Sequence, residues 1–284
     1  MSIQEKKSFP AIPAVLLSMI SVQSGASIAK RLFPVLGPGG TSSLRIGLSA
    51  IILFIVYKPD IRKLTKVQWF HCIGYGLSLA IMNLVFYYAI QRIPLGLGVT
   101  IEFIGPLALA LFLSRKILDV FWALLACLGI MLIVPWKNDG VDLIGLLLAF
   151  TAGIFWAGYI VLGGKISRIM KNGDAVTVGM GVATLFILPF GILSGDLEPL
   201  TIKYLIMGLG VALLSSAVPF SLDLIALKKL PSRTFSVLMS LQPAFGALAG
   251  LIFLKENLTL NQWISIFCVV IASIGVTLST KKKV

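Results

Sequence analysis

Ten long apolar stretches occupy almost the whole chain, and they restrict the fold more than any other feature of the sequence. Each is close to the ~20 residues that an α-helix needs to cross a hydrocarbon core of ~30 Å. Turn and charge signals separate the stretches. They run over residues 11–33, 38–57, 68–90, 94–114, 118–135, 142–163, 174–194, 202–225, 232–254 and 259–279. The sequence therefore predicts an all-α integral membrane protein with ten transmembrane helices.

The charged residues support a membrane protein and fix its expected orientation. Only 12% of the residues are charged and 58% are hydrophobic, whereas soluble domains have ~25% charged residues. The net charge of +13 comes from basic residues in short gaps between the apolar stretches. Most of these residues fall in alternate gaps, so we expect both termini in the cytoplasm, with residues 1–10 and 280–284 as tails. The lipid bilayer, rather than nucleic acid, is the expected partner of this basic charge.

An internal repeat divides the chain. The segment Ala89–Pro94 recurs 137 residues later as Ala226–Pro231, and the same offset places Pro106 on Pro243. A repeat of five helices is odd, so the second copy must enter the membrane from the opposite side. Such inverted repeats are common in secondary transporters, whose substrate site lies between the halves. We expect the two repeats to span residues 11–136 and 142–279.

Three ionisable residues lie inside the predicted helices, where a charge costs at least ~2.5–3.5 kcal/mol and usually has a function. Arg45 and Glu102 lie at similar depth, so they can form an ion pair that only fixes helix register. In the alternative, Glu102 binds a substrate amine or a proton, which we favour, while Arg45 is structural. Asp223 precedes basic residues at a helix end, which indicates an interfacial ion pair or part of an inner gate.

Two predicted helices contain a proline at equivalent positions, Pro106 and Pro243. A proline inside a helix frees a carbonyl group and kinks the axis, and paired breaks of this kind indicate a transporter site. Each kink can also be a packing feature without a ligand. Polar and aromatic residues of nearby helices are further candidates for the wall of the site. These candidates are Gln242, Ser240, Asn83, Tyr87 and Trp156, with Lys30 as a structural or gating residue.

Several classes of function lack their sequence signals. The chain has no phosphate-binding GxxxxGK[ST] loop and a single histidine, His71, and its three cysteines have no metal-ligand spacing. We therefore expect no cofactor, no metal and no enzymatic activity. A membrane-embedded lipid-modifying enzyme would need clustered acids or histidines, and a channel would need repeated polar rings. A solute or ion gradient is left as the driving force for transport.

The same segments resemble a known family. Ser21–Lys30, Glu102–Ala108, Ser221–Leu227 and Leu238–Ala244 are similar to the drug/metabolite transporter superfamily, in its EamA-type ten-helix branch. Within it, the chain resembles the bacterial threonine/homoserine exporters (RhtA-type). The resemblance implies a small amino acid as substrate, export across the bacterial inner membrane, proton antiport by alternating access, and a monomer or homodimer. Another small metabolite or drug is the alternative substrate. Gln242 departs from the pattern, because relatives usually carry a glutamate there.

Overall fold

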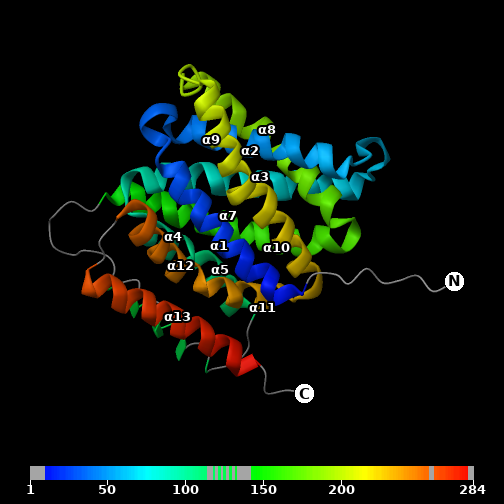
Figure 1. The fold of residues 1–284 in the computed structure, drawn as a ribbon. Helices are drawn as coiled ribbons and strands as arrows, with labels where there is room; N and C mark the ends of the chain where they lie inside the picture. The colour runs from blue at the N-terminus through cyan, green and yellow to red at the C-terminus, as the bar shows by residue number, and fades with distance from the viewer. Residues whose placement is uncertain are drawn as a thin grey trace.

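The computed structural model describes residues 10–113, 142–255 and 259–280, together with isolated positions between 118 and 132. The regular structure of these residues is helical throughout, without strands (Figure 1). The α-helices are α1 Ala11–Lys30, α2 Phe33–Tyr57, α3 Lys66–Arg92, α4 Leu95–Glu102, α5 Ile104–Phe112, α7 Leu143–Ile169, α8 Asn172–Leu193, α9 Ile202–Ala212, α10 Val218–Lys229, α11 Ser232–Leu238, α12 Gln242–Ala249 and α13 Leu260–Thr280.

Six helices are long and apolar enough to cross a membrane, which confirms a multi-pass helical membrane protein. They are α1, α2, α3, α7, α8 and the continuous span Ile202–Lys229, in which a π-helical turn joins α9 to α10. Shorter apolar helices lie within the fourth, ninth and tenth predicted stretches. The fifth predicted stretch, residues 118–135, lies largely outside the described residues.

Local sequence signals explain where the helices begin and end. α3 starts at a capping box, in which the Thr65 hydroxyl accepts the Gln68 N–H at 3.2 Å and the Gln68 side chain accepts the Thr65 N–H at 2.9 Å. The residue before a proline avoids the helical conformation. Ile93 before Pro94 is accordingly extended (φ −125°, ψ 158°), and so is Leu230, which precedes the proline of the second copy of the repeated segment.

The glycine-rich segment between the first two predicted helices, residues 37–40, forms a kink inside α2. Gly37 has φ 55°, a left-handed conformation that favours glycine. The carboxylate of Asp196, from the loop between α8 and α9, lies against Gly37 and accepts the N–H of Gly40 at 3.0 Å. A distant loop therefore caps the long helical segment that follows the kink.

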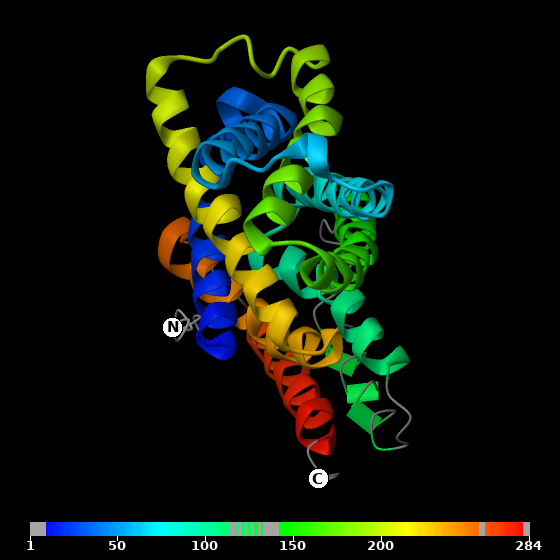
Figure 2. The ribbon, with the colours of Figure 1, turned by 90° about the vertical axis from the view of Figure 1, so that its right-hand side faces the viewer.

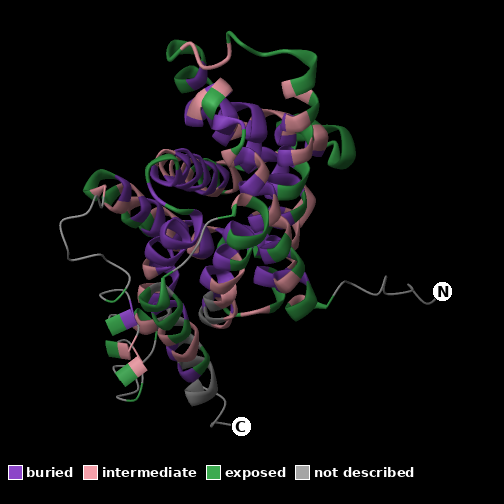
Figure 3. Cartoon of the chain, turned by 60° about the vertical axis from the view of Figure 1, so that its left-hand side comes forward, coloured by how far each residue is buried: buried purple, intermediate pink, exposed green. Residues whose placement is uncertain are grey.

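The distribution of side chains is that of a protein in lipid. Large apolar residues such as Phe112 and Leu193 are 88% and 86% exposed, while Arg45, Glu102 and Asp223 are buried. Figure 3 shows the buried residues concentrated between the helices and the exposed ones along the outer faces. A charged interior inside an apolar exterior is typical of a membrane protein with a polar pathway.

Helix packing brings separate parts of the chain to one central region. α1 runs beside α10, α2 packs against α8, and α3 packs along α7 (Figures 1 and 2). Where α5 begins, its backbone comes very close to α7: a Cβ atom added to Gly105 would lie 1.8 Å from the carbonyl oxygen of Gly153. This approach fixes the position of the break between α4 and α5.

A polar cavity as candidate functional site

A small cavity lies between α1, α2, α3, α4, α7, α10 and α12. The centres of water molecules can occupy about 60 Å³ of it, which is room for a few waters at ~10–15 Å³ each. Its polar lining consists of Ser18, Gln23, Arg45, Asn83, Glu102, Asp223 and Gln242. Its apolar lining consists of Val22, Ala26, Met82, Phe86, Val99, Trp156, Pro219, Phe220 and Met239. The cavity therefore offers one cation, two acids and neutral amides to a small solute.

Arg45 is held on one side and open on the other. Its Nε donates to the Ser216 hydroxyl at 2.6 Å, and its Nη2 donates to Asn83 Oδ1 at 2.5 Å and to the Ser215 carbonyl at 3.0 Å. Both serines lie in the π-helical turn Leu213–Ala217, where the backbone hydrogen-bond ladder is rearranged. The guanidinium carbon lies 5.0 Å from the ring centre of Tyr87. The two Nη1 hydrogens have no partner among the described residues, so one edge of the guanidinium is free to bind an anion.

Glu102 ends α4 at the helix break. Pro106 has no N–H to give to the Glu102 carbonyl, and this carbonyl instead lies against Gly153 of α7, where an added Cβ would come within 2.4 Å of it. The side chain is 7% exposed and lines the cavity. In the described part of the chain it has no hydrogen bond and no direct ion pair. Arg45 acts on Glu102 electrostatically without touching it, so the direct Arg45–Glu102 pair considered from the sequence does not form.

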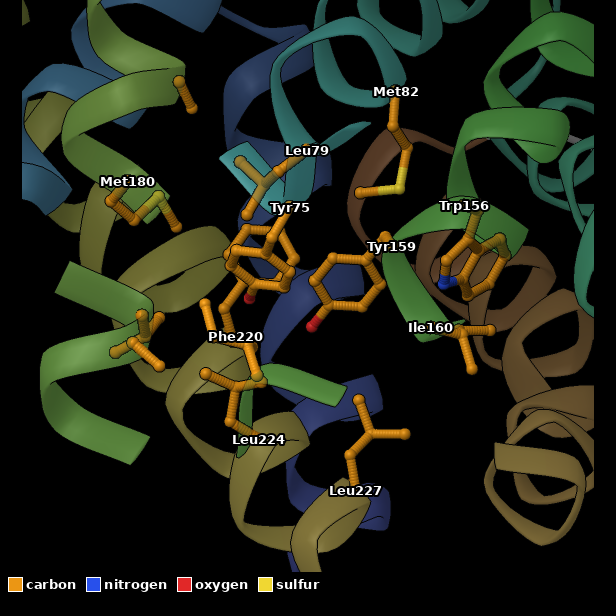
Figure 4. Close-up of a cluster of buried hydrophobic side chains, with 14 of the residues drawn as sticks. Tyr75, Leu79, Met82, Trp156, Tyr159, Ile160, Met180, Phe220, Leu224 and Leu227 are labelled. Atoms are coloured by element: carbon orange, nitrogen blue, oxygen red, sulfur yellow. The ribbon is translucent and has the colours of Figure 1, made fainter. Parts of the chain in front are cut away.

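Asp223 is 5% exposed and lies in the cavity wall. The Ser18 hydroxyl donates to its Oδ1 at 2.5 Å, and the Tyr159 hydroxyl donates to its Oδ2 at 3.1 Å. No ion pair with it is present among the described residues, but the side chain of Arg233, one of the basic residues that follow, lies outside them, so the interfacial ion pair stays a prediction. Asp223 lies on the face of α10 that turns toward the cavity. Figure 4 shows Tyr159 beside Tyr75 and Phe220, which position its ring.

The amide side chains of Gln23 and Gln242 close the cavity between α1 and α12. Gln23 of α1 donates from Nε2 to Oε1 of Gln242 at 2.6 Å. Gln242 follows a 3₁₀ turn, Met239–Leu241, and precedes Pro243 at the start of α12. The side chain of Ser240, a predicted wall residue in this turn, lies outside the described residues. The pair leaves a neutral donor and acceptor at the cavity wall.

The structure brings most of the predicted site residues together. Asn83, Glu102, Trp156 and Gln242 line the cavity, as do Arg45 and Asp223, which were predicted as structural or gating residues. Tyr87 is buried behind Arg45 and is not part of the wall. Lys30, at the end of α1, donates to the Ile93 carbonyl at 3.4 Å, beside the start of α4. Pro106 and Pro243 lie at the helix breaks rather than in the cavity wall.

Sequence reasoning missed Ser18 and Gln23. The available signal was helical spacing, since Ser18, Val22 and Ala26 recur every four residues and mark one face of α1. A polar residue on that face of an apolar helix is a candidate for a wet cavity. Across the part of the chain that the structure describes, no three His, Cys, Asp or Glu side chains gather as metal ligands.

The fold and the cavity define a multi-pass helical membrane protein with charged groups lining an internal cavity. The model of the EamA-like transporter family matches residues 143–278. The threonine/homoserine exporter RhtA of Salmonella typhimurium (strain LT2) is 43% identical over 275 residues, 96% of this chain and 92% of the relative. RhtA of Escherichia coli (strain K12) is 42% identical over the same shares. The uncharacterized transporter YvbV of Bacillus subtilis is 25% identical over 270 residues, 87% of this chain and 86% of the relative.

One solved crystal structure shares the fold, with a TM-score of 0.66 and 16% identity over 95% of this chain and 98% of the other. The chain belongs to the EamA-like transporter family, as its extensive similarity to the RhtA exporters demonstrates. This confirms the family resemblance predicted from the sequence. It also confirms that the chain is a transporter and not an enzyme.

Proposed function

We propose that this protein is a secondary exporter of small amino acids of the threonine and homoserine class across the bacterial inner membrane. The main support is the pairing of two groups in one cavity: the free Nη1 edge of Arg45 and the unbonded carboxylate of Glu102. A free amino acid carries a carboxylate and an ammonium group, and these two sites are complementary to them in charge. The two RhtA relatives, which carry the name of threonine/homoserine exporters, support the same substrate class.

Each polar group of the cavity has a role in this proposal. The free Nη1 of Arg45 donates a charge-assisted hydrogen bond to the substrate carboxylate. Glu102 binds the amine or a proton. The amides of Gln23 and Gln242 offer hydrogen bonds to the side-chain hydroxyl of the substrate.

Transport follows from the architecture that the sequence predicts. Ten helices form two inverted repeats, residues 11–136 and 142–279, with both termini in the cytoplasm. The cavity lies between α1, α2, α3 and α4 of the first repeat and α7, α10 and α12 of the second. The matching extended residues before Pro94 and Pro231 support the repeat. The repeats rock against each other and open the cavity to one side at a time, with proton entry driving amino acid exit.

Counterflow in proteoliposomes tests the substrate class directly. Vesicles loaded with unlabelled threonine or homoserine are expected to accumulate the labelled amino acid with saturable kinetics. Glu102→Gln removes the charge with little change of shape and is expected to abolish this uptake, whereas Glu198→Gln, the same change in an exposed loop, keeps it. Absence of counterflow for every amino acid tested with the wild type would refute the proposal. Equal uptake by Glu102→Gln and wild type would remove Glu102 from the mechanism.

A further inference from the structure

The cavity contains two acids whose surroundings differ. Glu102 accepts no hydrogen bond from the described residues and lies in the electric field of Arg45. Asp223 has both carboxylate oxygens occupied, one by Ser18 and the other by Tyr159. These partners are neutral hydroxyl groups. Within the described residues, Glu102 therefore has both carboxylate oxygens open to a ligand, whereas Asp223 is hydrogen-bonded at both oxygens and has no ion pair.

Asp223 is also set apart from a residue that holds Arg45. Ser216, which accepts from Arg45, precedes Asp223 by seven residues in the same span. Seven residues are nearly two turns, so the two side chains share one face of the helix and lie about 10 Å apart along its axis. Asp223 is thus separated from the guanidinium that we assign to the substrate carboxylate.

The charged and titratable groups around Asp223 are few. α1 contributes Ser18, and α7 contributes Tyr159, with Tyr75 of α3 stacked behind it at 5.2 Å between ring centres. From α8, the Asn172 amide reaches only the Leu224 carbonyl. Arg45 and Glu102 line the same cavity. The neighbouring segments carry Asp174 in the first turn of α8, Lys228 and Lys229 at the end of α10, and Arg233 of α11, whose side chain is outside the described residues. None of the described ones forms an ion pair with Asp223.

A buried acid without a balancing cation is costly in a membrane protein and takes up a cation. A substrate ammonium group has three donors and needs several free acceptors, and the hydroxyl groups of Ser18 and Tyr159 already take one lone pair on each oxygen of Asp223. A proton needs no such space. When Asp223 is protonated, one of its oxygens becomes a donor and a weaker acceptor, so the hydrogen bond from the hydroxyl group at that oxygen weakens. That change would alter the contacts that join α1, α7 and α10.

We propose that Asp223, with Ser18 and Tyr159, is the proton-exchange site of this transporter, separate from the Arg45–Glu102 substrate site. This inference rests on the proposed amino acid export. With the cavity open to the outside, a proton from water forms an O–H bond with the Asp223 carboxylate. With the cavity open to the cytoplasm, that bond breaks and the proton enters the cytoplasmic water. One proton moves inward per cycle. Glu102, and not Asp223, holds the substrate ammonium group.

Two assays on the same proteoliposomes test this division. In Asp223→Asn, accumulation driven by a pH gradient is expected to fall to the level without a gradient, and any remaining counterflow is expected to be independent of pH. Glu102→Gln is expected to lose both activities, and Glu198→Gln, the matched exposed control, neither. Gradient-driven accumulation by Asp223→Asn at the wild-type level would overturn the inference. So would joint loss of binding and counterflow in Asp223→Asn, since Asp223 would then hold the substrate.

Conservative changes of the two hydroxyl partners keep the inference testable if Asp223→Asn does not insert. Ser18→Ala and Tyr159→Phe remove a donor to the carboxylate and so disfavour its ionised form. The pH of half-maximal gradient-driven efflux is expected to rise in both, whereas a purely structural role would lower the rate at every pH equally. An unchanged pH profile in both variants contradicts the proton role. Absence of wild-type counterflow would instead refute the amino acid export on which this inference depends.

Discussion

The close approach of α5 and α7 gives a mutational prediction whose size follows from the structure. In Gly105→Ala the new Cβ would lie 1.8 Å from the Gly153 carbonyl oxygen, whereas ordinary C···O contacts begin near ~3.3 Å. The helices must therefore separate by about 1.5 Å at this point. Overpacking usually costs ~1–3 kcal/mol, and the obstacle here is backbone that cannot rotate away, so we expect a loss of about 3 kcal/mol.

Thermal unfolding of the purified protein in detergent measures this loss. At roughly 2–4 °C per kcal/mol for a large chain, the melting temperature of Gly105→Ala should fall by about 6–12 °C. Gly210→Ala is the matched control, because nothing lies within 4 Å of its added Cβ. That change should leave stability equal or raise it by about 0.5–1 kcal/mol. If both variants have the same melting temperature, the close backbone contact at the helix break is not present in the protein.

Three further changes test the site and its supports. Arg45→Lys removes a planar group that makes three hydrogen bonds. The KM for amino acid efflux should therefore rise about tenfold or more. An unchanged KM would exclude carboxylate binding at Arg45. Gln242→Glu keeps an acceptor for the Gln23 amide, so this variant should still insert into the membrane and show counterflow. Loss of insertion would contradict this prediction. Asp196→Ala leaves the Gly40 N–H without its acceptor and should lower stability by about 1 kcal/mol. Asp196→Asn, which keeps an acceptor oxygen, should melt near the wild type, and equal melting of all three proteins would argue against the cap.

The sequence predicted those parts of the fold that local chemistry decides. The kink at Pro106 was predicted from a single residue, and the structure has a helix break there. The capping box at Thr65 and the extended residue before Pro94, which were not predicted, likewise arise from a few neighbouring residues. Apolar length likewise identified the long membrane-crossing helices. These features depend on backbone hydrogen bonding and steric exclusion, which act within one or two helical turns.

The site was less predictable because it depends on which face of each helix turns inward. Depth along the chain suggested that Arg45 and Glu102 could pair, but Arg45 instead bonds Ser216 and its neighbour in a π-helical turn. No local pattern in the apolar sequence marks that turn. Asp223 was expected near a membrane face, and it reaches the cavity because α10 packs beside α1.

Labelling of a cysteine in the cavity wall tests most directly whether substrate passes through this cavity. Val22 lines the cavity without belonging to its polar groups, so Val22→Cys can be made in a chain whose Cys72, Cys127 and Cys268 are replaced. We expect a membrane-impermeant thiol reagent to label it from either side of sealed vesicles, and saturating homoserine to slow that labelling. Labelling from neither side, or labelling that homoserine leaves unchanged while counterflow continues, would contradict transport through this cavity.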